Sequence, residues 1–205
     1  MQKTALSSEP VASKLLFCIY ATIGLTLILS ANTLYEMVDP TGAQKYVMGI
    51  GILGVITLII LLFLIVYFVV WVYRLHKDLY AFFPDYSISP KKAMAMTLIP
   101  VYNAWGIWKL TKELFVRFQV NDISLSWFTI RIQSLYVWML VLGGIENALS
   151  RFMAKDTFKT LEVTQKLGME ALSTVLSITQ LALWYIILTL VMKGIRSLNE
   201  KDRLL

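Results

Sequence analysis

Four stretches of the chain hold almost no charge and are long enough to cross a membrane. A transmembrane helix needs about 20 apolar residues, because each residue advances about 1.5 Å across a hydrocarbon core of about 30 Å. Of the 205 residues, 58% are hydrophobic, whereas a soluble domain has about 45–50%. The sequence therefore predicts an all-α, polytopic membrane protein that forms a single membrane domain over residues 1–205, with spans at about 15–35, 47–73, 123–145 and 171–192.

The first apolar run is expected to be a retained span. A signal peptide would have a hydrophobic region of about 7–15 residues followed by a small-x-small cleavage site. Here Glu9 lies in the leader, the run is longer and no such site follows.

The Lys and Arg residues predict the orientation, because cytoplasmic loops are enriched in them. Thirteen lie before the first span, between spans 2 and 3, or after the last span: Lys3, Lys14, Arg74, Lys77, Lys91, Lys92, Lys109, Lys112, Arg117, Lys193, Arg196, Lys201 and Arg203. The other two loops hold five: Lys45, Arg151, Lys155, Lys159 and Lys166. Both termini are therefore expected in the cytoplasm, which also accounts for the net charge of +6 without nucleic acid binding.

The apolar stretch LIPVYNAWGIW, residues 98–108, lies within the largest cytoplasmic segment. Its uncharged run covers residues 93–108, which is short for a span, and Pro100 should stop or kink a helix there. We expect an interfacial or re-entrant hairpin at about 90–119, which turns over Pro100 to Asn103; a fifth span is the alternative.

After Pro100 the sequence predicts an amphipathic helix. Apolar residues recur at three- and four-residue steps (Ala104, Ile107, Trp108, Leu114, Phe115 and Phe118), with cations on the other side. Such a helix lies in the interface with its apolar face in lipid and its cations at anionic headgroups. Together with the end of span 2, it predicts a surface for lipid or a partner: Arg74, Lys77, Trp105, Trp108, Lys109, Lys112 and Arg117.

Residues 74–114 also resemble the core of a bacterial multi-pass membrane family catalogued as domain of unknown function 4328. The residues that carry the resemblance are an arginine after a span, a proline-marked loop, an aliphatic-Pro-x-x-Asn-x-Trp motif and a basic helix: Arg74, Pro90, Pro100, Asn103, Trp105 and Lys109. The resemblance extends over about 47–192. It implies a multi-pass membrane fold in a bacterial inner membrane, and it implies no activity.

Two polar residues lie inside predicted spans. Arg131 either snorkels to the cytoplasmic interface or acts in a pore, relay or subunit contact. Gln180, midway along the last span, is expected to bind a neighbouring helix. The loop at 146–170 is either a short amphipathic helix or an extension of spans 3 and 4.

No motif points to catalysis. Gly49, Gly51 and Gly54 match G-x-G-x-x-G, but they open an apolar helix without the acid that a dinucleotide site needs, so we expect them to allow close helix packing. His76 is a lone histidine, expected to face solvent, and an enzyme acting through His76 or Asp78 is only a third hypothesis. With the single cysteine Cys18, the sequence predicts no disulfide within the chain, no metal site and no cofactor.

These features favour a non-enzymatic membrane subunit. It would form a homo-oligomer through its spans and act as an anchor, scaffold or sensor for a cytoplasmic protein. The alternative is an oligomeric channel or transporter, in which Arg131, Gln180 and the bend at Pro100 and Asn103 would line the path.

Overall fold

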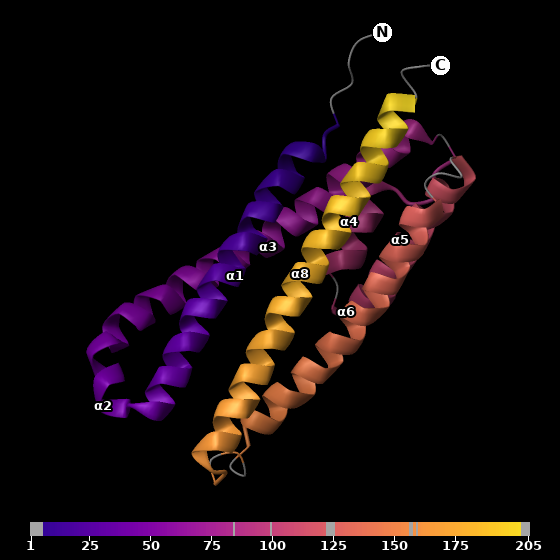
Figure 1. The fold of residues 1–205 in the computed structure, drawn as a ribbon. Helices are drawn as coiled ribbons and strands as arrows, with labels where there is room; N and C mark the ends of the chain where they lie inside the picture. Colours follow the sequence, from indigo (N-terminus) through magenta and orange to yellow (C-terminus); the bar gives the residue numbers. More distant parts are fainter. Residues whose placement is uncertain are drawn as a thin grey trace. The chain divides into compact units, whose positions relative to one another are not determined.

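The computed structural model of the chain describes residues 6–83, 85–98, 100–121, 126–155, 158 and 160–201. Every regular element in these residues is a helix (Figure 1). In chain order they are α1 (Glu9–Val38), α2 (Pro40–Ala43), η1 (Gln44–Tyr46), α3 (Val47–Phe82), α4 (Pro90–Leu98), α5 (Pro100–Asn121), α6 (Ser126–Met153) and α8 (Val163–Lys201).

Four helices are long and apolar enough to cross a membrane, which confirms the prediction of an all-α protein with four candidate spans. The apolar segments within them are Glu9–Val38, Thr41–Phe82, Ile130–Met153 and Val163–Glu200. Each overlaps one of the spans expected from the sequence.

The third of these helices ends later than the sequence predicted. α6 continues past residue 145 to Met153, and α8 already begins at Val163. The segment between 146 and 153 contains no glycine or proline, and Arg151 donates to the Asn147 side chain one turn earlier at 3.2 Å. Extension of the two helices therefore describes residues 146–153 and 163–170 of this region.

A carboxylate cap connects α1 to α3. Oδ1 of Asp39 accepts hydrogen bonds from Gly42 N at 2.9 Å and from Thr41 Oγ1 at 2.8 Å. Asp39 stands just before Pro40, and proline is preferred at the first helical position. Figure 1 shows the chain reversing direction at α2, so that α1 and α3 extend from α2 toward the same side.

The chain divides into two compact units. Unit 1 comprises residues 1–17, 64–135 and 186–205, and unit 2 comprises residues 18–63 and 136–185. Most of the buried apolar side chains belong to unit 1, whereas most of the exposed large apolar side chains belong to unit 2. Unit 1 therefore has a core like that of a soluble domain, and unit 2 presents an apolar surface that water would not favour.

The buried face of α5 forms part of the unit 1 core. Leu114, Phe115 and Phe118 are at most 5% exposed, and the ring of Phe118 lies against Gly194 of α8. The expectation that this face lies in lipid is wrong for these three residues, because protein covers them, with α8 contacting Phe118. Trp108, by contrast, is 43% exposed.

The α4–α5 hairpin consists of one helix that ends before Pro100 and a second helix that begins at Pro100. α4 begins at Pro90, where Ser89 Oγ accepts from Lys92 N at 3.3 Å, and it ends at Leu98. Pro100 then opens α5, so Pro100 to Asn103 form its first turn and not the turn of the hairpin. The physical reason is that proline disfavours helix at the residue before it, not at the residues after it.

Gly106 lets α5 approach α4 closely. A Cβ placed on Gly106 would lie 2.7 Å from the backbone oxygen of Met96 and 2.9 Å from its Cβ. By contrast, a Cβ on Gly49, Gly51 or Gly54 would meet nothing within 4 Å. Within one chain these three glycines therefore contact no other helix, and close packing at them stays a prediction for a second copy of the chain.

We predict that Gly106→Ala destabilises unit 1 by about 1–3 kcal/mol, because overpacking at this contact outweighs the better helix propensity of alanine. Thermal unfolding in one detergent measures the effect. Gly168→Ala is the matched control, because a Cβ there would meet nothing within 4 Å, and it should leave the midpoint unchanged or raise it. A Gly106→Ala protein that unfolds no earlier than wild type would contradict the close contact.

Candidate functional site

The carboxylate of Asp78 holds the start of α1 in unit 1. Oδ1 accepts from Ser7 N at 3.0 Å and Ser7 Oγ at 2.6 Å, while Oδ2 accepts from Ser8 N at 2.9 Å and Ser8 Oγ at 2.6 Å. Arg74, one turn earlier on α3, donates to the carbonyl of Ser7 at 3.2 Å. Asp78 is 9% exposed. Four donated hydrogen bonds replace the water that this carboxylate loses on burial.

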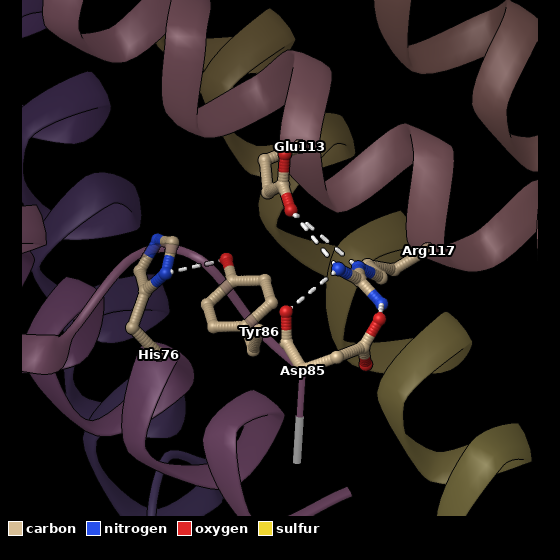
Figure 2. A network of polar contacts seen from close by, with 5 residues as sticks. All are labelled: His76, Asp85, Tyr86, Glu113 and Arg117. Atoms are coloured by element: carbon tan, nitrogen blue, oxygen red, sulfur yellow. Dashed lines mark hydrogen bonds and ion pairs between the residues drawn. The ribbon is translucent and has the colours of Figure 1, made fainter. Parts of the chain in front are cut away.

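The segment that follows α3 is fixed by a phenol–imidazole pair. Tyr86 Oη lies 2.7 Å from Nδ1 of His76, and both side chains are buried (Figure 2). Burial raises the pKa of the Tyr86 phenol, which keeps it protonated and able to donate to the imidazole. The expectation that His76 faces solvent is wrong: it is 3% exposed, and the ring of Tyr86 lies against it.

Arg117 connects α5 to the same segment. Its guanidinium donates to Oδ2 of Asp85 at 2.6 Å and to Oε1 of Glu113 at 3.4 Å (Figure 2). It also lies 5.8 Å from the ring centroid of Phe83 and 5.9 Å from that of Tyr86. The hydrogen bond from Arg117 lowers the pKa of Asp85 and raises that of Arg117 itself. Arg117 therefore organises unit 1 internally rather than forming part of an open partner surface.

Most acidic side chains described in unit 1 are used inside the unit. Asp78 binds the two serines, Asp85 and Glu113 bind Arg117, and Glu9 forms an ion pair with Arg196. Many basic side chains of the unit remain exposed: Lys14, Arg74, Lys77, Lys91, Lys92, Lys112, Lys193 and Arg196. We call these eight the unit 1 cations. Together they make the described part of unit 1 a positively charged surface.

Unit 2 contains a polar contact between α6 and α8. Ser177 Oγ donates to Oε1 of Glu146. Gln180, with its amide oriented to satisfy its neighbours, donates to Oε2 of Glu146 at 2.6 Å and accepts from Gly143 N at 2.8 Å. A Cβ on Gly143 would lie 2.6 Å from the terminal amide atom of Gln180 that faces it, so this glycine makes room for the side chain. Gln180 thus binds a neighbouring helix.

The other predicted site residues are only partly covered by the structure. Arg131 lies on α6 in unit 1 and is exposed, whereas Gln180 belongs to unit 2. A shared path for these two residues therefore stays a prediction. The side chains of Pro100, Asn103 and Trp105 lie outside the described residues.

The side chains of His76 and Asp78 have partners within unit 1. His76 is engaged with Tyr86, and both oxygens of Asp78 accept hydrogen bonds from serines. Among the described residues, no group of three His, Cys, Asp or Glu side chains is placed to hold a metal ion. These contacts hold the elements of unit 1 together.

Comparisons with family models, with curated proteins and with solved structures each find no match for the chain. The resemblance of residues 74–114 to a family of unknown function stays a prediction. Any functional conclusion must therefore come from the chain's own charges, burial and contacts.

We predict that Tyr86→Phe lowers stability by about 1–3 kcal/mol, because it leaves the buried His76 ring without its hydrogen-bond partner. Thermal unfolding of the purified protein measures the loss. Tyr80→Phe is the matched control, since Tyr80 is 51% exposed. Equal unfolding midpoints for the two variants would show that the Tyr86–His76 bond adds nothing.

Proposed function

We propose that the chain is a non-enzymatic integral membrane subunit that anchors, recruits or senses a cytoplasmic protein at a bacterial inner membrane. One observation carries this proposal: the exposed cations are concentrated in unit 1, while its carboxylates are used for internal contacts. A surface of exposed cations suits the binding of a partner protein better than it suits catalysis.

The distribution of side chains supports a membrane location. Unit 2 exposes large apolar residues along α3 that hydrocarbon would cover at no cost, among them Leu58, Leu62 and Phe63. The unit 1 cations all come from the basic group expected on the cytoplasmic side. On this proposal unit 1 lies at the cytoplasmic face, both termini are cytoplasmic, and unit 2 is within and beyond the hydrocarbon.

The α4–α5 hairpin would lie at the cytoplasmic interface. Trp108 and Lys112 are one turn apart on α5 and both exposed, and tryptophan and lysine suit the headgroup layer. The buried face of α5 belongs to the protein core, so only this exposed edge is left to meet lipid. The hairpin would thus be interfacial, without a fifth span.

The charge of the unit 1 cations favours an acidic partner. The positive charge of unit 1 would attract an acidic cytoplasmic protein. The unit's own acids Asp78, Asp85 and Glu113 already have other partners, so they would not compete with that protein for the exposed cations. Charge complementarity mainly sets the rate and specificity of such an encounter.

Self-association would use α3. The apolar window of Thr41–Phe82 has none of its residues buried within the chain, and Gly49, Gly51 and Gly54 are open on it. Glycines on an apolar helix allow another helix to approach closely. A second copy of the chain would provide that helix, and the result is a homo-oligomer.

A channel or transporter is the second candidate. The observation that favours it is the bonding of Gln180 to Glu146, which places a polar group inside candidate spans. Such an oligomer would carry ions or solutes across liposomes, whereas a scaffold would not, and Arg131→Ala would reveal whether that residue lines the path.

Capture of cytoplasmic proteins by the full-length chain tests the scaffold proposal. We predict that a double variant, Lys91→Glu with Lys92→Glu, loses about tenfold or more of a partner captured by crosslinking in intact cells. The control is Lys155→Glu with Lys166→Glu, which reverses the same charge in unit 2. Equal capture by wild type and both variants, or no specific partner, would contradict the proposal.

A further inference from the structure

The α4–α5 hairpin lies in the chain between two candidate spans. α3 ends at Phe82, with seven residues before α4 begins at Pro90. α5 ends at Asn121, with four residues before α6 begins at Ser126. Both α3 and α6 contain a candidate span. These short connections keep the hairpin within reach of a bilayer surface.

The two helices of the hairpin bring three exposed lysines to one level. Gly106 lies against Met96, so α5 runs back along α4 from that contact. Lys112 is six residues beyond Gly106, about 9 Å further along α5. Lys91 and Lys92 are five and four residues before Met96, about 6–8 Å along α4 in the same direction. We call Lys91, Lys92 and Lys112 the hairpin lysines.

Exposed apolar side chains lie nearer the closed end of the same hairpin. Leu98, the last residue of α4, is 52% exposed and lies six residues, about 9 Å, beyond Lys92. Trp108 is 43% exposed and lies four residues, about 6 Å, before Lys112 on α5. The separation matches an apolar surface that enters the boundary between headgroups and acyl chains by about 5–10 Å, with its cations outside.

The charge of the hairpin favours a lipid phosphate as the ligand. Within residues 90–121 the sequence has one acid, Glu113, and its carboxylate pairs with Arg117. The hairpin lysines are exposed, and a lysine ammonium binds phosphate as a compact point charge. An anionic phospholipid presents a phosphate next to acyl chains, so it suits both the lysines and the apolar side chains beside them. An acidic protein would suit only the lysines.

We propose that the α4–α5 hairpin binds an anionic phospholipid. Its closed end enters the acyl layer with Leu98 and Trp108, and the hairpin lysines bind the phosphate. The inference rests on the interfacial placement of the hairpin in the proposed function and adds its ligand. Lys91 and Lys92 also belong to the unit 1 cations, so the lipid would compete there with an acidic protein. Lipid binding needs no protein partner, and a failure to capture one would leave it intact.

Native mass spectrometry of the full-length protein in mild detergent tests the lipid site. Phosphatidylglycerol is the anionic probe, and phosphatidylethanolamine with the same acyl chains is the zwitterionic control. Wild type should bind phosphatidylglycerol in preference. The triple variant Lys91→Gln, Lys92→Gln and Lys112→Gln should bind it about tenfold or more weakly, because each lysine contributes to the attraction of anionic lipid.

A matched triple variant controls for the loss of charge. Lys45→Gln with Lys155→Gln and Lys166→Gln removes the same three charges from unit 2. Because these lysines lie outside the hairpin, the affinity for phosphatidylglycerol should change by less than about twofold.

Spin labels measure the insertion of the closed end. With Cys18 replaced by serine, a label on Leu98→Cys in phosphatidylglycerol vesicles should be reached by oxygen, which concentrates in hydrocarbon, and little by a polar nickel chelate. A label on Lys92→Cys should show the opposite accessibility, because it lies at the level of the headgroups.

Several outcomes would overturn the proposal. Equal binding of the two lipids, or an equal loss in the two triple variants, would exclude a site at the hairpin lysines. A label on Leu98→Cys that the nickel chelate reaches as readily as one on Lys92→Cys would exclude insertion. Displacement of the lipid by glycerol phosphate at equal concentration would show that the site takes a soluble phosphate ester in place of a lipid.

Discussion

The carboxylate of Asp78 ties the start of the chain to the end of α3. A carboxylate that leaves water must be met by donors or cations of the protein, and here four donors of Ser7 and Ser8 meet it. The same requirement explains the ion pairs of Arg117 and the bonding of Glu146. Carboxylates thus fix the helices of unit 1 on one another, and the cations that remain exposed give the unit its charge.

The helices themselves were predictable from the sequence because a membrane span leaves a long uncharged run, and α1, α3, α6 and α8 each contain or overlap one. The helix ends were less predictable. α6 runs to Met153 because nothing in residues 146–153 stops a helix. The predicted span ended earlier, at residue 145, because a charged residue follows there. Glu146 was therefore placed in a loop, although it lies on a helix beside Gln180.

The polar contacts were predictable only where they are local. The four-residue spacing of Glu113 and Arg117 is one that allows an ion pair one turn apart on a helix, and the structure contains that pair. Two other contacts join residues far apart in local structure: Arg117 with Asp85, and Tyr86 with His76. No rule based on residue spacing predicts them. The buried face of α5 shows the same limit: an amphipathic pattern predicts an apolar face but does not say whether protein or lipid covers it.

We proposed above that unit 1 lies at the cytoplasmic face of the membrane, and labelling of single cysteines from one side of the membrane tests this orientation. Cys18 is buried and is replaced by serine to give a clean background. An impermeant maleimide applied to bacterial cells with a permeabilised outer membrane should then label Lys155→Cys at once, and Lys92→Cys only after the inner membrane is opened. Labelling of Lys92→Cys in intact cells, or of both positions from the same side, would contradict the account.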